Sequence, residues 1–545
     1  MRGASEGETV EGHPGDLALA ALEQFGVEVM FTLNGGHVWP LYEAARRRGI
    51  RIVDTRHEQT ATWAAEAWAK LTRTPGLAVL TAGPGVTNGM SAITSAHFNG
   101  SPLVVLAGRA PLGTWGSGAL QELDHVPLVS PVTKRAVTIT EGSATGLAVS
   151  ELARTALTPH RGPVFADIPM DVMFTPTSGE VPGRRESHPS GGDADPELVR
   201  SVAAAVAAAQ RPALFAGSDV YWGGAEEELA AAVEALDLPC FSNGMGRGCL
   251  PPGHPLAFSR TRGLLRSEAD LVVVAGTPLD FRLGFGRFGS ARVVHLVDHA
   301  DCASGHVPGV TTVAGDLRAI LAALAATSAD HRPWVDRMRD AERAARGADG
   351  GLLTAGGARI KPTRVFGELS KRLAADAVVI CDGGDFASYA GKYVEPGRPG
   401  CWLDTGPYGC LGNGPGYAIA ARLARPSSQV VALLGDGAAG FSLMDADTLV
   451  RHGLPVVMVV GNNGMWGLEK HPMQALYGWD VACDLQPDTR YDRIVAVLGG
   501  AGETVNDPDE IGPALDRAFG SGVPYLLNVR TDPADVYPRS GITGF

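Results

Sequence analysis

The chain is 545 residues long, 45% of its residues are hydrophobic, and its formal net charge at pH 7 is −13. This length exceeds what one hydrophobic core usually supports, so we expect three domains. The acidic balance argues against nucleic acid and against an anionic membrane surface as partners. No apolar stretch is long enough to span a bilayer, and Met1 to Asp16 is polar, unlike a signal peptide. We therefore expect a cytoplasmic protein with no membrane partner.

The seven cysteines are scattered along the chain, and no two of them form a CxxC pair. An odd number at irregular spacing matches neither a disulfide framework nor a zinc site. We expect them to be reduced and buried, as in a cytosolic enzyme.

The first part of the chain alternates predicted helices and strands. We expect residues 1–12 to be a frayed tail, and helical periodicity begins at Asp16. Strands are predicted at residues 27–31, 51–54, 77–80, 103–107 and 164–168. The alternation indicates a doubly wound α/β domain, which we place at residues 12–175.

Two loose stretches divide the rest of the chain. Residues 173–195 are rich in Pro, Gly and Ser and predict a linker. A second α/β domain, residues 193–345, has predicted strands near residues 212–216, 271–275 and 293–297. Residues 346–361 are again loose and precede a third α/β domain at residues 360–540. The expected fold class is therefore α/β, with three doubly wound parallel-sheet domains.

The third domain contains two apolar runs, residues 430–434 and 456–460, that predict strands buried on both faces. Between them we predict a helix at residues 442–452, which Gly453 ends. A strand–helix–strand unit of this length implies parallel strands. The residues that follow the two strands should therefore meet at one edge of the sheet.

Asp436 and Asn463 occupy these two positions, in the sequences GDG and NNG. A carboxylate and an amide oxygen suit a hard dication such as Mg²⁺ that keeps phosphate oxygens among its ligands. Gly435 and Gly437, with Ala438 beside them, allow close approach of the backbone to a phosphate. The plain alternative is a tight strand-to-helix turn and an Asn-Gly turn. Because each motif closes a predicted buried strand, we predict a site for a metal-bound phosphate.

GDG followed one strand–helix unit later by NN resembles the signature of thiamine diphosphate (ThDP) enzymes. The resemblance implies that the side chains of Asp436 and Asn463 and the main-chain carbonyl of Met465 hold Mg²⁺. It also places the glycines of the GDG motif beside the cofactor diphosphate. Gly384 and Asp385, in the sequence CDGGD, occupy a predicted strand-end loop at which relatives contact the diphosphate.

The first domain resembles the pyrimidine-binding domain in one branch of these enzymes, which includes acetolactate synthases, 2-hydroxyacyl-CoA lyases and oxalyl-CoA decarboxylases. The matching sequences are HEQ at 57–59, TAGPGVTN at 81–88, LQE at 120–122, PVTK at 131–134 and RGPVFADIPMDV at 161–172. Gly83 and Asn88 of the second run would contact the cofactor. With the middle and third domains, the resemblance covers nearly the whole chain.

Three residues of the first domain are candidates for catalysis. On its own, Glu58 is a carboxylate favoured by a helix N-terminus. By the resemblance, its carboxyl group sits beside N1′ of the aminopyrimidine and drives the imino tautomer, which removes the proton from thiazolium C2. Gln121 matches a glutamine that lines the reaction space in acetolactate synthases. His37 lies on a loop that faces the same space, although a loop histidine is more often a satisfied surface group.

The run GPYGCLGNGPG, residues 406–416, matches the segment that folds the bound cofactor in this family. Leu411 stands where many relatives have Met and would be the wedge between the two cofactor rings. Gly409 would offer its carbonyl to the 4′-amino group. Without the resemblance, Leu411 would be an ordinary core residue and the glycines an ordinary loop.

Two functions fit this branch. One is a lyase that cleaves a 2-hydroxyacyl-CoA to an aldehyde or ketone plus formyl-CoA, and the other is an acetolactate synthase-like condensation of 2-oxo acids. Met170 stands where synthases usually have Lys, and GMWG at residues 464–467 is closer to the lyases. Against this, Arg282 matches an arginine that synthases place near the substrate. We predict the lyase, with the synthase as the alternative. A non-catalytic scaffold is the third hypothesis, and the presence of Glu58 argues against it.

The middle domain holds FAD in acetolactate synthases and ADP in oxalyl-CoA decarboxylases, so either nucleotide is expected here. Asp298, at the end of a predicted strand, is placed to bind a ribose hydroxyl, or is a plain turn carboxylate. Glu58 and the metal residues lie in different domains, and in relatives the two faces meet between subunits. We therefore expect a homodimer or homotetramer with active sites at the subunit interface.

Overall fold

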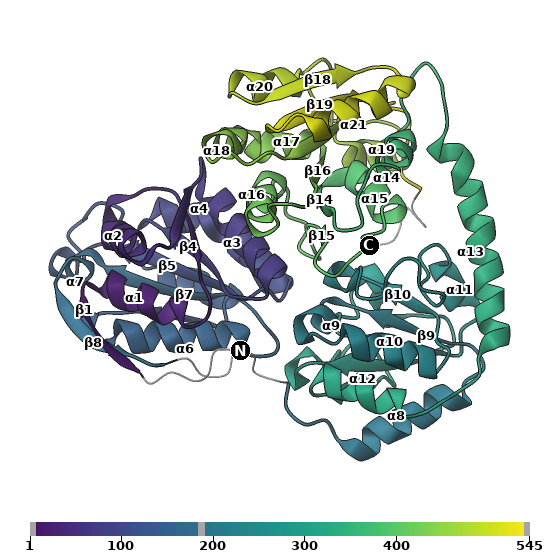
Figure 1. Cartoon of the computed structure of the whole chain (residues 1–545), viewed down its shortest axis with the longest axis horizontal. Coiled ribbons are helices and arrows are strands. Elements are labelled where there is room, and N and C mark those ends of the chain that lie inside the picture. Colours follow the sequence, from purple (N-terminus) through teal and green to yellow (C-terminus); the bar gives the residue numbers. More distant parts are fainter. Residues whose placement is uncertain (1–6, 184–190, 539–545) are drawn as a thin grey trace. The chain divides into compact units, whose positions relative to one another are not determined.

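The computed structural model of the chain describes residues 7–183 and 191–538 (Figure 1). The helices and strands form two compact units. Among the described residues, the first unit comprises residues 7–183, 405–426 and 442–454, and the second comprises residues 191–404, 427–441 and 455–538.

The first unit is built on a sheet of six parallel strands in the order β3-β2-β4-β5-β7-β6. These strands are β2 (Val29–Thr32), β3 (Arg51–Asp54), β4 (Gly76–Leu80), β5 (Leu103–Arg109), β6 (Arg135–Thr138) and β7 (Val164–Pro169). The helices are α1 (Pro14–Glu23), α2 (Trp39–Arg48), α3 (Glu58–Thr72), α4 (Pro84–Phe98), α5 (His125–Val129), α6 (Thr145–Leu157) and α7 (Met170–Met173). Helices α1 and α6 cover one face and α3 and α4 the other, which is why the central strands are apolar throughout (Figure 1).

Two segments from the last third of the sequence complete the first unit. Helix α16 (Gly414–Ala424) packs along α3, and α18 (Ala446–Arg451) follows the short helix η8 (Leu443–Asp445). Between α16 and α3, the Tyr417 hydroxyl donates to Glu66 over 2.8 Å, and Lys70 lies 2.8 Å from the same carboxylate. These buried charges are compensated within the contact, as burial requires.

The second unit contains two further parallel sheets. The smaller has the order β10-β9-β11-β12-β13. Its strands are β9 (Pro212–Ala216), β10 (Cys240–Ser242), β11 (Leu271–Ala275), β12 (Arg292–Val297) and β13 (Thr311–Ala314). Its helices are α8 (Pro196–Ala208), α9 (Ser218–Gly223), α10 (Glu226–Ala235), α11 (Arg262–Ser267) and α12 (Leu317–Ala325).

The larger sheet of the second unit has the order β15-β14-β16-β17-β19-β18, again all parallel. Its strands are β14 (Val378–Asp382), β15 (Trp402–Leu403), β16 (Val430–Gly435), β17 (Val457–Asn462), β18 (Ala501–Val505) and β19 (Tyr525–Arg530). Its helices are α13 (Arg332–Leu353), α14 (Pro362–Ser370), α15 (Gly384–Tyr393), α17 (Asp436–Ser442), α19 (Gly467–Tyr477), α20 (Tyr491–Val497) and α21 (Ile511–Gly520). The fold is thus α/β with three doubly wound parallel sheets, as predicted.

The strand orders locate the positions at which such sheets bind ligands. In the first sheet the order reverses between β2 and β4, and in the larger sheet of the second unit it reverses between β14 and β16. At a reversal, the loops that follow the two strands diverge and leave a crevice at the carboxyl edge. The GDG motif follows β16 directly, so the topology places it at such a crevice.

Several local predictions were wrong. Residues 8–12, predicted as part of a frayed tail, form β1 (Glu8–Gly12), which pairs antiparallel with β8 (Thr177–Val181) inside the predicted linker. Helix α13 continues to Leu353, through part of the predicted loose stretch, where Asp349 is buried and pairs with Arg260 (2.9 Å) and Lys392 (2.8 Å). The helix predicted at residues 442–452 begins at Asp436 as α17 and is interrupted by η8.

All seven cysteines lie in the described residues and form no disulfide; five are buried, and Cys302 and Cys410 are half-buried. The described part of the chain contains no helix with the length and apolar character needed to cross a bilayer.

Candidate active site

The loops after β16 and β17 lie side by side in the second unit. Gly435 and Gly461 are register partners at the ends of these strands. Beyond them, the Asp436 carboxylate accepts hydrogen bonds from the backbone N–H groups of Gly437 (2.9 Å) and Gly464 (2.7 Å). Asn463 is half-buried, and its Oδ1 accepts from the N–H of Met465 over 3.2 Å. The structure therefore brings the GDG and NNG motifs together at one edge of the sheet.

The Asp436 carboxylate is buried without a cationic side chain. It is only 4% exposed, and none of the ion pairs among the described residues involves it. Burial raises the pKa of Asp436 to about 6, although the surrounding backbone N–H groups act in the opposite direction. A buried carboxylate is stabilised as an anion by a dication, and the carboxylate, amide and carbonyl oxygens gathered here are hard donors. The residues present therefore fit Mg²⁺.

The two asparagines of NNG differ in their surroundings. Asn462 is buried, and its Nδ2 donates to Oδ1 of Asn528 (3.0 Å) and to the carbonyl of Thr489 (3.2 Å). Asn462 therefore joins β17 to its neighbours and is satisfied within the protein. Asn463 is the residue left at the open edge of the loop.

The crevice is shaped by glycines that cannot be replaced without a clash. A Cβ on Gly437 would lie 2.4 Å from the ring of Trp466, and a Cβ on Gly461 would lie 2.3 Å from Phe386. After β14, Gly383 and Gly384 both have positive φ, 67° and 70°. A Cβ on Gly435 would be 3.6 Å from the carbonyl of Gly383, so the loops after β14 and β16 approach each other closely.

Gly384 opens α15 and faces free space, since a Cβ built on it would meet no atom within 4 Å. Asp385 follows it, and a Cβ on Gly467 would lie 3.1 Å from the Asp385 carboxylate. Ala438, within α17, is buried. The predicted diphosphate residues thus lie on glycine-rich loops at this edge of the sheet, where the backbone can approach a phosphate closely.

Glu58 is the first residue of α3 in the first unit and is 6% exposed. Asn88, on the neighbouring helix α4, donates from Nδ2 to Glu58 Oε2 over 3.0 Å. His57 caps the helix, and its Nδ1 accepts from the N–H of Gln59 over 3.1 Å. Asn88, predicted at the cofactor, is therefore in direct contact with the predicted catalytic carboxyl group.

His37 and Gln121 meet through Thr81. The Thr81 hydroxyl lies 3.3 Å from His37 Nδ1 and 3.5 Å from Gln121 Oε1. Burial is the main cause that lowers the pKa of His37, and a backbone hydrogen bond with Leu120 opposes it. His37 is thus a buried group linked to Gln121 through the Thr81 hydroxyl, and not the surface histidine that its loop position suggested.

The predicted wedge segment also belongs to the first unit. Gly406 has φ +63°, and a Cβ there would overlap Asn99 at 1.7 Å. Gly409 has φ +71° and is exposed, whereas Leu411 is half-buried. The Ser442 hydroxyl donates to the carbonyl of Gly412 over 2.6 Å and fixes the end of the run.

The sequence did not indicate one supporting residue near Glu58. Asp445, in η8, accepts a hydrogen bond of 2.7 Å from the N–H of Arg56, two residues before Glu58. Its carboxylate is buried and also accepts from the Thr448 hydroxyl over 2.9 Å. Because Asp445 and Arg56 lie far apart in the chain, no local pattern could have paired them.

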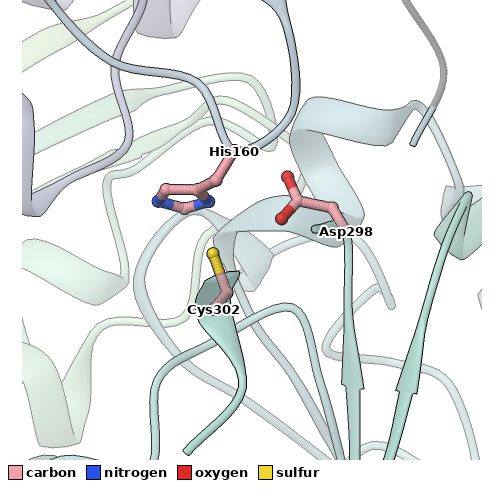
Figure 2. Close-up of side chains that lie close together, drawn as sticks. All are labelled: His160, Asp298 and Cys302. Carbon is pink, nitrogen blue, oxygen red and sulfur yellow. The ribbon is translucent and has the colours of Figure 1, made fainter. Parts of the chain in front are cut away.

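The predicted residues are divided between the two units. Glu58, His37, Gln121, Gly83, Asn88 and the wedge segment are in the first, while the metal-binding residues, Gly384, Asp385 and Asp298 are in the second. Asp298 follows β12 and is buried, and Cys302 closes the short helix η7 (Ala300–Cys302) just after it (Figure 2). His160, also drawn in Figure 2, belongs to the first unit, so it is not grouped with them.

Known proteins match this chain along nearly its whole length. Three models of thiamine pyrophosphate enzymes, whose cofactor is ThDP, match it: the N-terminal TPP-binding domain at residues 13–128, the central domain at 199–324 and the C-terminal TPP-binding domain at 382–529. The chain is 50% identical over 531 residues to a probable acetolactate synthase of Mycobacterium bovis and to the acetolactate synthase large subunit IlvG of Mycobacterium tuberculosis. Each alignment covers 97% of this chain and 97% of the relative.

A second group of relatives is more distant. The chain is 33% identical over 581 residues to the human 2-hydroxyacyl-CoA lyase 2, which covers 96% of this chain and 91% of that protein. These matches confirm the resemblance that the motifs predicted. The chain belongs to the thiamine pyrophosphate enzymes and is a ThDP-dependent enzyme of the branch that contains acetolactate synthases and 2-hydroxyacyl-CoA lyases.

Proposed function

We propose that this enzyme is an acetolactate synthase-type transferase, which releases CO₂ from one 2-oxo acid and joins the remaining acyl unit to a second. The observation that carries this proposal is the 50% identity to two acetolactate synthases along 97% of the chain, against 33% for the human lyase. It reverses the order predicted from the sequence, in which the lyase came first. The identity to the two synthases outweighs the presence of Met170 in place of a lysine.

In this proposal, Asp436, Asn463 and the Met465 carbonyl hold Mg²⁺. The loops that contain Gly384, Asp385, Gly435, Gly437 and Ala438 then surround the diphosphate. The support is the buried Asp436 carboxylate, which lacks a cationic partner among the described residues, and the glycines of the neighbouring loops. Bound ThDP supplies an electron sink for carbon–carbon bond cleavage and formation.

The first domain, residues 12–175 in our division, supplies the groups that act on the pyrimidine end and on the substrate. Glu58 exchanges a proton with N1′, and Asn88 orients its carboxyl group. Gly83, Gly409 and Leu411 fix the shape of the bound cofactor. Gln121 and His37, joined through Thr81, form the wall of the reaction space.

The middle domain, residues 193–345, contributes no catalytic residue to this proposal. Asp298 is buried at the end of β12, one strand away from the reversal of strand order between β9 and β11. In dinucleotide-binding folds the acid that binds the ribose also follows a strand next to the reversal, so this position is compatible with binding of the ribose of FAD or ADP.

We also propose that the third domain, residues 360–540, meets the first domain of a second copy, so that the enzyme is a homodimer or homotetramer. Phe98 and Tyr408 support association, because their stacked rings, 5.3 Å apart, are 49% and 46% exposed. Leu120, next to Gln121, is 78% exposed. Large apolar side chains exposed together mark interaction surfaces.

The second candidate function is the 2-hydroxyacyl-CoA lyase. Met170 favours it, because a half-buried thioether cannot pair with a substrate carboxylate. Arg282, the residue that argued for the synthase, donates to the Asp280 carboxylate from Nη2 (2.7 Å) and from Nε (3.0 and 3.1 Å). Because Arg282 is already paired with Asp280, it is a weaker candidate for binding the carboxylate of a substrate. It therefore gives less support to the synthase.

One experiment separates the two functions. Purified protein with ThDP and Mg²⁺ is given pyruvate or a 2-hydroxyacyl-CoA, with an Asp436→Ala variant as the control for contaminating enzymes. We expect acetolactate and CO₂ from pyruvate. Formation of an aldehyde or ketone plus formyl-CoA from the second substrate, with no acetolactate from the first, would replace our conclusion with the lyase.

A further inference from the structure

A buried chain of hydrogen bonds in the first unit has no role in the function proposed so far. The N–H of Gly83 donates to His125 Nε2 over 2.9 Å, and His125 Nδ1 lies 2.8 Å from Asp167 Oδ2. Arg109 Nη1 lies 3.0 Å from the same Asp167 oxygen and 3.0 Å from Asp124. His125 and Asp167 are completely buried. The chain thus runs from an ion pair in the core to the Gly83 peptide.

The hydrogen bonds determine the protonation of His125. A backbone N–H can only donate, so His125 Nε2 must carry a lone pair toward Gly83. Nδ1 must then carry the proton and donate it to the Asp167 carboxylate. Arg109 remains positively charged and compensates that carboxylate. His125 is therefore a neutral imidazole protonated on Nδ1, held in one orientation from both sides.

The Gly83 peptide in turn supports Gln121. A Cβ on Gly83 would lie 2.9 Å from both Cβ and the carbonyl oxygen of Gln121, so the two backbones are in close contact. Gly83 has φ +57° and Gln121 has φ +60°. For glutamine this left-handed conformation is strained and persists only where its neighbours hold it. The segment before Gln121 is held as well, because the Arg109 guanidinium stacks on Trp115 at 4.0 Å.

We propose that His125 is a positioning residue which, through the Gly83 peptide, fixes Gln121 in the orientation that the substrate meets. The inference rests on the role of Gln121 in the proposed function. His125 itself touches neither substrate nor cofactor. His125 is held by the Asp167–Arg109 ion pair and in turn holds the Gly83 peptide. The Gly83 peptide then keeps the strained residue Gln121 in place at the wall of the site.

Two substitutions separate the two hydrogen bonds of His125. In His125→Gln, Oε1 can take the place of Nε2 and accept from Gly83, while the bond to Asp167 is lost. In His125→Asn, Nδ2 can take the place of Nδ1 and donate to Asp167, while Gly83 loses its acceptor. Each variant loses one buried hydrogen bond of His125 and keeps the other, so similar losses of stability are expected.

We expect His125→Asn to have a kcat/KM roughly tenfold to a hundredfold below that of His125→Gln, because small displacements of a positioning group have effects of this size. The Tm values of the two variants should be similar. If the two kcat/KM values fall equally, alongside equal losses of Tm, His125 is a structural residue only and the proposal is wrong.

Gln121→Ala distinguishes failure of this inference from failure of the proposed function. If Gln121→Ala keeps the wild-type kcat/KM, Gln121 has no role in the proposed function. The orientation of Gln121 by His125 would then have no effect on activity. Loss of activity in Gln121→Ala, with no difference between the two His125 variants, would overturn the inference alone.

The protonation of His125 can be tested without turnover. In wild-type protein containing ¹⁵N-labelled histidine and bound ThDP and Mg²⁺, we expect one neutral imidazole protonated on Nδ1 whose signals disappear in His125→Gln. A proton on Nε2, or on both nitrogens, would leave the Gly83 N–H without its acceptor and would contradict the proposal.

Discussion

Asn88 donates a hydrogen bond from its side-chain amide to Oε2 of Glu58 over 3.0 Å. The two residues lie on the neighbouring helices α3 and α4, and Glu58 is almost completely buried. An amide donor can bind a carboxyl oxygen whether or not the group carries its proton. In the proposed function, Asn88 would therefore hold Glu58 in one orientation while a proton moves to and from the cofactor.

Replacement of Glu58 tests its role directly. Glu58→Gln keeps the size of the side chain but cannot transfer a proton to N1′, so exchange of the C2 proton of bound ThDP should slow by about two to four decades. ThDP should still bind. Hydrogen–deuterium exchange at C2, followed by NMR after acid quench, measures the rate directly.

Glu66→Gln is the matched control, because Glu66 is a buried glutamate of the same helix that is bound by Tyr417, Lys70 and Asn99. Its loss should lower the Tm and leave C2 exchange near the wild-type rate. Wild-type exchange in Glu58→Gln would remove Glu58 from the mechanism.

Removal of the Asn88 amide should have a smaller effect on the same measurement. Asn88→Ala leaves Glu58 in place without its donor, and a hydrogen bond to a carboxyl group contributes about 1.5 kcal/mol, which corresponds to roughly tenfold in rate. We expect C2 exchange to slow by about that factor, with little change in ThDP affinity. A loss of ThDP binding with an unchanged exchange rate would show instead that Asn88 contacts the cofactor, as first predicted.

The parallel strands could be predicted from the sequence because short apolar runs, and the helices that join them along the chain, are local patterns. The apolar runs at residues 430–434 and 456–460 became β16 and β17, and parallel pairing then required Asp436 to approach the loop after β17. The pairing of β1 with β8 was missed because its register joins Glu8 to Val181, and no local pattern specifies a contact of that span. The buried partners of His125 and Asp445 were missed for the same reason.

Asp436 should be indispensable for cofactor retention. Asp436→Ala removes the charged ligand of the proposed metal site, so both Mg²⁺ and ThDP should be lost on gel filtration. Asp492→Asn is a suitable control, because Asp492 is also a buried aspartate of the second unit but is bound to Arg490 and Thr504. It should lower the Tm and keep both ligands. Retention of Mg²⁺ and ThDP by Asp436→Ala would contradict the site assignment.

His37 should make the stability of the folded protein depend on pH. Burial lowers the pKa of His37 below its ordinary value, whereas in the unfolded chain a histidine titrates near pH 6.5. As the pH falls below about 6.5, the unfolded state takes up this proton first, so the free energy of unfolding decreases. Above that pH the effect is absent, because His37 is neutral in both states.

His37→Gln removes this contribution, so the variant should lose less stability than the wild type between about pH 7 and pH 5. Urea midpoints at the two pH values give the comparison. Equal losses in the two proteins would show that His37 protonates as easily in the folded state as in the unfolded state.

Assembly follows from the division of the catalytic residues between the two units. In the proposed function, Glu58 would act at the pyrimidine end of a cofactor whose diphosphate end would be held at Asp436. We expect Glu58 of one chain to serve the metal site of a second, so that a symmetric dimer has two equivalent sites. Co-expression of a Glu58→Gln chain and an Asp436→Ala chain, each with its own affinity tag, yields mixed dimers that can be isolated by two purification steps. In such a dimer one site has both substitutions and the other has neither, so about half of the wild-type activity per dimer should return although each variant alone is inactive. If the verified mixed dimer stays inactive, each site is built within a single chain, and the proposed interface is wrong.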